Sequence, residues 1–149
     1  MDDNMKSAYR ERHKQACVAA YNLLVKVWPP DRGVEYWENT AKLFAEVDNR
    51  HRDNPLVRSL LVGMYNCMGF TMDDSDLHDP ASGAAHKVAF RVILDLVNDI
   101  VTGDKLAQAP EIIDLTRGAY PDNKLLHAML DLLPQYLEAV QKELKTKGV

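Results

Sequence analysis

Cysteine and glycine are scarce in this chain of 149 residues, and each scarcity narrows the folds that it can adopt. The two cysteines, Cys17 and Cys67, are too few for a disulfide framework. Both fall within apolar helical patterns, where a free thiol behaves as a small hydrophobic side chain. We therefore expect buried free thiols and a reducing compartment, the cytoplasm. Only seven glycines are available for turns, and no segment shows clean alternation of apolar and polar residues, so the sequence predicts an all-α fold.

The chain also lacks an excess of positive charge and any long apolar run. The chain has 18 Lys and Arg against 22 Asp and Glu, for a net charge of −4. Nucleic-acid-binding proteins usually carry the opposite balance, so a nucleic-acid partner is disfavoured. No apolar stretch approaches the roughly 20 residues that cross a bilayer. The acidic start Met1–Asp3 is not followed by an apolar run, so we expect neither a membrane span nor a secretory signal. No phosphate-cradling glycine loop is present, and we expect no cofactor.

What the chain does contain is helical periodicity. Apolar residues recur near every 3.6 positions, and Pro29–Pro30 and Gly103 punctuate the pattern. We expect a single domain, residues 1–149, in two three-helix halves at about 5–68 and 84–147 that are joined by a polar loop, 69–83. The fold is then a six-helix bundle or a short stack of helical hairpins. The expected helices cover approximately residues 5–27, 34–49, 54–68, 84–101, 110–118 and 124–145.

The two halves echo each other at a fixed offset of 69 residues. Sliding residues 20–68 onto 89–137 places apolar positions on apolar positions. The pair Asp53-Asn54 falls on Asp122-Asn123, and Leu61 falls on Leu130. Such a pattern is typical of an internal duplication with pseudo-two-fold symmetry. Amphipathic helices of similar length also align in this way by default, so the sequence leaves both interpretations open.

A stretch of the second half resembles a known repeat. Residues 103–107 contain a Gly-Asp turn, and Pro121-Asp122-Asn123 links into the following helix. Ala109, Ile113 and Thr116 match the spacing of the second helix of tetratricopeptide-type repeats. Over about residues 90–123 the chain therefore resembles this family of helical hairpins. The resemblance implies a scaffold for protein interactions.

The absence of an assembled catalytic constellation favours a non-enzymatic interaction or regulatory domain. Its partner is expected to be a protein, and a second copy of the chain is one candidate. Aromatic side chains dominate the energetics of protein interfaces. Tyr36, Trp37 and Trp28 are therefore the predicted partner-binding residues, and packing in the core is the alternative role for them.

One enzymatic alternative comes from the acidic loop 73–79. His78-Asp79 is similar to the paired His-Asp of the HD-domain phosphohydrolases, which are all-helical metal enzymes. That resemblance implies a metal held by His78, Asp79 and an upstream histidine such as His51, with a later aspartate such as Asp131. Adjacent His and Asp ligands suit a metal-activated water that attacks a phosphate. The simpler interpretation is a solvated linker, in which Asp79 caps the next helix and Pro80 is its first residue.

Overall fold

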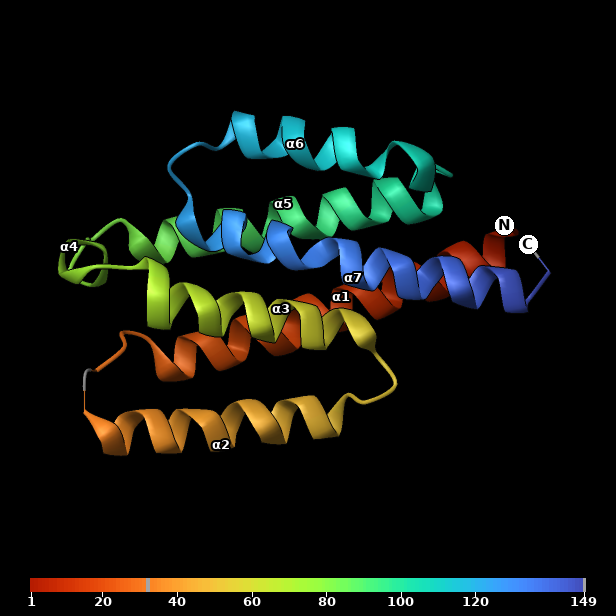
Figure 1. Ribbon diagram of the computed structural model, residues 1–149. Coiled ribbons are helices and arrows are strands. Elements are labelled where there is room, and N and C mark those ends of the chain that lie inside the picture. Colours follow the sequence, from red (N-terminus) through yellow and green to blue (C-terminus); the bar gives the residue numbers. More distant parts are fainter. Residues whose placement is uncertain (32, 149) are drawn as a thin grey trace.

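The computed structural model describes residues 1–31 and 33–148, and all the regular secondary structure in this part of the chain is helical, with no strand (Figure 1). Seven α-helices are accompanied by a π-helical turn, η1, and a 3₁₀ turn, η2. The all-α prediction is therefore confirmed. The elements are α1 (Asp3–Val27), α2 (Val34–Arg50), α3 (Pro55–Asn66), η1 (Cys67–Thr71), α4 (Asp74–Leu77), α5 (Ser82–Thr102), η2 (Leu106–Gln108), α6 (Ala109–Ala119) and α7 (Lys124–Thr146).

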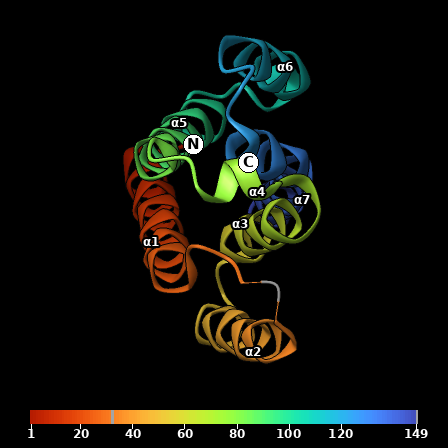
Figure 2. The same ribbon diagram turned by 90° about the vertical axis from the view of Figure 1, so that its left-hand side faces the viewer.

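Four helices make the centre of the bundle. The most extensive packing joins α3 to α7, followed by α1 to α5, α1 to α3 and α5 to α7. Helices α2 and α6 lie outside this group, on opposite sides (Figure 2). Most side chains between the central helices are buried and apolar, which makes their removal from water the main stabilising contribution. They include Leu56, Leu60, Met64, Leu125, Met129 and Leu133.

Helices α3 and α7 approach closely at Gly63. A Cβ atom added at Gly63 would lie 2.9 Å from both the carbonyl oxygen of Ala128 and the Cα of Met129. These are backbone atoms, which cannot rotate away as the end of a side chain can. The hydrogen at Gly63 is therefore what permits this helix spacing.

The 69-residue offset has a counterpart in the structure. Helix α3 begins at Pro55 and α7 at Lys124, which are 69 residues apart. Asn54 and Asn123 precede these helices, and each donates its side-chain NH₂ to a backbone carbonyl of the first long helix in its own half. Asn54 bonds to the oxygen of Arg12 at 2.9 Å, and Asn123 bonds to that of Ala85 at 3.0 Å. The start of α3 in the first half and the start of α7 in the second half are thus held in the same way.

The predicted joint between the halves is more ordered than a polar linker. Helix α3 runs into the π-helical turn η1, and α4 follows. Asp73 caps α4 by accepting the backbone N–H of Asp76, whose carboxylate accepts the N–H of Asp73 in return. The expected cap at Asp79 is wrong: its carboxylate accepts from the N–H of Ala81, and α5 begins at Ser82. Sequence periodicity missed α4 because a helix of one turn shows no repeat.

No helix in the described residues is long and apolar enough to cross a membrane. Cys17 and Cys67 are both buried and unpaired, as predicted.

Candidate interaction groove

The three aromatic residues predicted to bind a partner are half-buried and lie around the junction of α1 and α2. Trp28 packs edge-on against the ring of His86 on α5, with the ring centroids 4.5 Å apart. The hydroxyl of Tyr36 donates to the carbonyl oxygen of Val27 at 2.6 Å. Tyr36 therefore ties the start of α2 to the end of α1. Trp37 instead faces α3, where its ring meets that of Tyr65 at 5.5 Å.

Trp37 belongs to a row of aromatic rings between α2 and α3. The ring of Trp37 lies next to that of Tyr36, also on α2, with the ring centroids 5.2 Å apart, and next to that of Tyr65 on α3. The ring of Tyr65 in turn contacts that of Phe44, with the centroids 5.4 Å apart. Each pair is close to perpendicular, an arrangement that places the positive edge of one ring on the negative face of the next. The row fixes the outer helix α2 on α3. The sequence predicted Trp37 as a contact residue but did not single out Phe44 or Tyr65.

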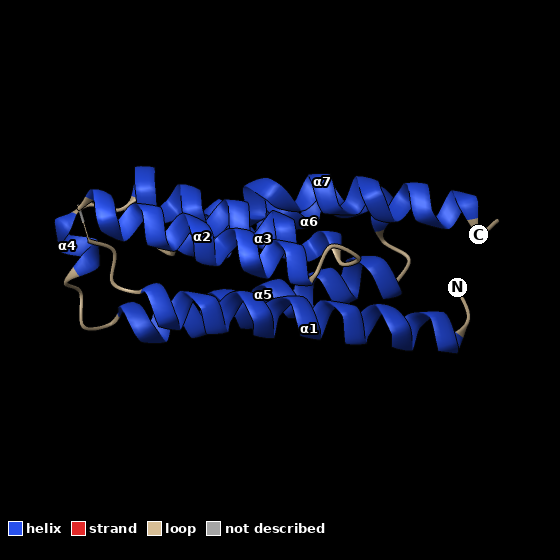
Figure 3. Cartoon of the chain, turned by 90° about the horizontal axis from the view of Figure 1, so that it is seen from below, coloured by secondary structure: helices blue, strands red, loops and turns tan. Residues whose placement is uncertain are grey.

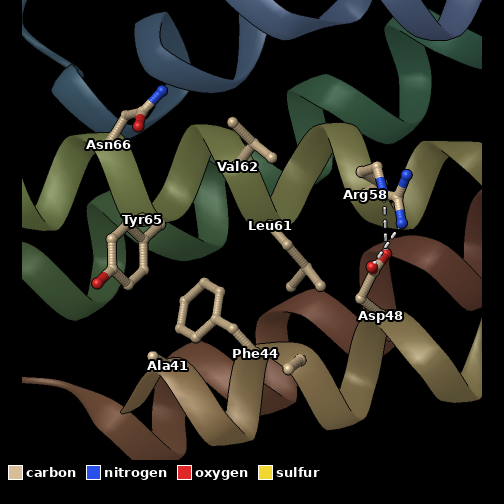
Figure 4. A pocket seen from close by; sticks show the side chains of 9 residues that line it. Ala41, Phe44, Asp48, Arg58, Leu61, Val62, Tyr65 and Asn66 are labelled. Carbon is tan, nitrogen blue, oxygen red and sulfur yellow. Dashed lines mark hydrogen bonds and ion pairs between the residues drawn. The ribbon is translucent and has the colours of Figure 1, made fainter. Parts of the chain in front are cut away.

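A groove with a volume of about 370 Å³ opens beside this row, between α2 and α3 (Figure 4). Phe44, Leu61 and Tyr65 point towards one another across it. Ala41 and Ala45 present small side chains one turn apart on α2, and Val62 on the opposite wall remains 41% exposed. We call this surface the α2–α3 groove; its lining residues are Ala41, Phe44, Ala45, Asp48, Arg58, Leu61, Val62, Tyr65 and Asn66.

An ion pair closes one end of the α2–α3 groove. The guanidinium of Arg58 bonds to both carboxylate oxygens of Asp48, at 2.8 and 3.2 Å (Figure 4). The hydrogen bonds from Arg58 lower the pKa of Asp48 below its ordinary value, so its carboxylate stays charged. Beyond the pair, a polar pocket lies at the start of α3 and includes His51 and Tyr136. The groove itself is therefore apolar up to this charged end.

The other end of the α2–α3 groove reaches η1. A Cβ atom added at Gly69 would lie 3.9 Å from the indole of Trp37, so η1 and the start of α2 are neighbours. Phe70, next in the turn, is 83% exposed, and Val34 at the start of α2 is 75% exposed. Short π-helical segments recur at functional sites because they redirect side chains that a regular helix would place elsewhere. Beyond the residues that line the groove, this end of the bundle therefore has two exposed apolar side chains, Phe70 and Val34.

The residues of the predicted metal site are dispersed. His78 and Asp79 are exposed and follow α4, whereas His51 caps α2 at the opposite end of the bundle (Figure 1). Asp131 is held by an ion pair with Arg117 at 2.9 Å. Within residues 1–31 and 33–148, no group of three or more His, Cys, Asp or Glu side chains is placed to hold a metal. The fold separates His51 from His78 because α3 and η1 span the length between them.

A buried polar network that the sequence did not indicate joins α1, α5 and α7. His13 is fully buried; its Nδ1 lies 2.7 Å from the Asn98 Oδ1 and its Nε2 lies 2.6 Å from the Tyr136 hydroxyl. A neutral ring that donates from Nδ1 and accepts at Nε2 satisfies both contacts. Burial lowers the pKa of His13 to about 4. The one available signal was the register of His13, which shares a helical face with Tyr9, Ala16 and Ala20.

An ion pair beside this network holds the chain ends together. Arg12 on α1 makes two hydrogen bonds to the carboxylate of Glu143 on α7, at 2.9 and 3.0 Å. The two termini lie at the same end of the bundle (Figure 3). The bonds from Arg12 lower the pKa of Glu143 to about 2. Because His13 and Tyr136 are buried, this network contributes to the packing of α1, α5 and α7.

No protein-family model, curated protein or solved structure matches this chain.

Proposed function

We propose that this chain is a non-enzymatic interaction domain whose α2–α3 groove accepts an amphipathic helix from a protein partner. The observation that carries the proposal is the groove itself. It combines an apolar floor, small alanine side chains on one wall and partly exposed aromatic rings at its margin. Grooves of this kind accept the apolar stripe of a helix, whose anchor residues recur at positions i, i+3, i+4 and i+7.

The helical-repeat interpretation supports the same proposal. Each half consists of two helices of the central group and one outer helix, and the positions around the outer helices correspond at the 69-residue offset. Phe44, Asp48 and Leu61 line the α2–α3 groove, and residues 69 positions later, Ile113, Arg117 and Leu130, line a pocket between α6 and α7. We propose that the halves are two copies of one helical unit. The free thiols support a cytoplasmic location for the protein.

Selection from a displayed library of amphipathic helices tests the docking proposal. Ala45→Arg places a long charged side chain at the wall of the groove, where Ala45 is exposed and the fold has room for it. Ala8→Arg makes the same change on an exposed face of α1 and is the matched control. We expect helices that bind the unmodified protein and the Ala8→Arg variant but lose at least about tenfold in affinity for Ala45→Arg. Helices that bind all three proteins equally would contradict the proposal.

A further inference from the structure

The end of the molecule near Phe70 is strongly acidic. Two segments of the sequence, residues 31–38 and 69–79, contain seven aspartates and glutamates and one arginine. The second segment approaches the first at Gly69, next to Trp37, whereas its Asp76 and Asp79 lie beside the starts of α5 and α7. One of the carboxylates, Asp76, is paired with Lys124 at 2.7 Å. Glu35 and Glu38 on α2 and Asp73 after η1 are exposed. We call these two segments the acidic end.

The acidic end also contains the most exposed large apolar side chain among the residues that the structure describes. Phe70 is 83% exposed, and Val34, at 75%, is on the neighbouring element. Single exposed apolar residues are common on protein surfaces. Phe70 differs from Leu115 on α6, which is 75% exposed, because Phe70 lies in the turn η1 that directly continues α3, one of the two helices that line the α2–α3 groove.

Charge and apolar surface together define the partner. A helix that lies along the α2–α3 groove meets the Asp48–Arg58 pair at one end, where the charges already balance. At the other end the lining stops at Ala41 and Asn66, and a helix that continues past them along α2 approaches Glu38 and Glu35 of the acidic end. Opposite charges across an interface speed association and reject partners of the wrong sign. A neutral or acidic helix would bring no positive charge to these carboxylates.

We infer that the partner of the α2–α3 groove is a basic amphipathic helix that packs an apolar side chain against Phe70 and places Lys or Arg over the acidic end. This inference rests on the docking function proposed above. It adds that the partner helix is positively charged and that the charge is concentrated at the end of the helix that lies over the acidic end.

Three synthetic peptides of about five helical turns test the inference. They share one leucine and alanine stripe and differ only in the polar face, which carries lysine, glutamate or glutamine. Binding to the whole chain is measured by fluorescence anisotropy at low and high salt. We expect the lysine peptide to bind at least about tenfold more tightly than the glutamate peptide, with the difference shrinking as salt screens the charges.

Two matched pairs of variants locate the effect. Phe70→Ala removes the exposed ring, and Leu115→Ala is its control, since Leu115 is similarly exposed on α6. The double change Glu35→Gln and Glu38→Gln removes charge at the acidic end, and Glu111→Gln with Asp95→Asn removes as much charge elsewhere on the surface. We expect the first variant of each pair to lower the affinity for the lysine peptide at least about fivefold. The control variants should leave that affinity unchanged. All six positions are exposed, so folding is preserved.

The outcomes separate the two proposals. Equal binding of the lysine, glutamate and glutamine peptides, all sensitive to Ala45→Arg, would overturn the basic partner and leave the docking function standing. Failure of every peptide to bind would overturn both. Sedimentation provides a further test: a dimer of the chain that dissociates on Phe70→Ala would show that a second copy covers this surface, and it would overturn the inference.

Discussion

Lowering the pH from 7 to 5 is expected to cost the folded state about 2 kcal/mol through His13 alone. The unfolded chain titrates His13 near its ordinary pKa of 6.5, and the folded protein does so at about 4. Between these values the unfolded state binds a proton that the folded state excludes, so stability falls with decreasing pH. The loss begins near pH 6.5 and levels off below pH 4, where it reaches about 3 kcal/mol.

The physical cause is specific to the buried network. A protonated His13 would carry N–H groups at both nitrogens in a fully buried site, and the nearby Arg12 adds positive charge. Asn98 can still accept from Nδ1, but the Tyr136 hydroxyl would have to turn its proton away from Nε2 and find another acceptor.

Urea unfolding between pH 7 and pH 4.5 measures the effect, and a His13→Gln variant serves as the reference. His86 is also buried, and its pKa is lowered by burial, so it contributes a loss in the same direction. Subtracting the variant leaves the part due to His13, which should be about 2 kcal/mol between pH 7 and 5. Identical pH slopes in the two proteins would refute the reasoning, as would an NMR titration that places the pKa of His13 near 6.5.

Two other predictions concern the core. Gly63→Ala should destabilise the fold by about 1–3 kcal/mol in urea unfolding, because the new Cβ meets the backbone of α7. Gly83→Ala, with open space around it, should be neutral or gain up to about 1 kcal/mol; equal effects at the two sites would contradict the close approach. Burial raises the pKa of Cys17 and Cys67 to about 12, so both thiols should react with Ellman's reagent only as fast as the protein opens, and rapid labelling of the native state would disprove their burial.

Periodicity gave the positions of the six longer helices because each must bury one continuous apolar stripe. It predicted the ends of these helices less accurately. The chain after α3 continues as the π-helical turn η1, and α5 begins at Ser82, two residues before the expected start. The signals at these ends are local hydrogen bonds, such as those of Asp73 and Asp79, whose choice of partner depends on the loop's final path.

The candidate groove was predictable only in part. Trp37 was predicted as a contact residue from its chemistry, and it lies at the margin of the α2–α3 groove. Its neighbour Tyr65 comes from another helix, so the aromatic row exists only once α2 has folded back on α3. A tyrosine on the apolar face of an amphipathic helix has the same sequence pattern whether it is buried in the core or partly exposed in a groove.

By itself, the sequence determined an all-helical chain with buried free thiols and Asn residues before α3 and α7, because each of these depends on spacing and residue type within one segment. The tertiary structure alone decided that His51 and His78 lie far apart, that His13 is a buried neutral ring and that Phe70 stands exposed beside a groove. Each of these depends on which helices meet, and the α3–α7 crossing at Gly63 helps to set that arrangement through a contact between segments 65 residues apart.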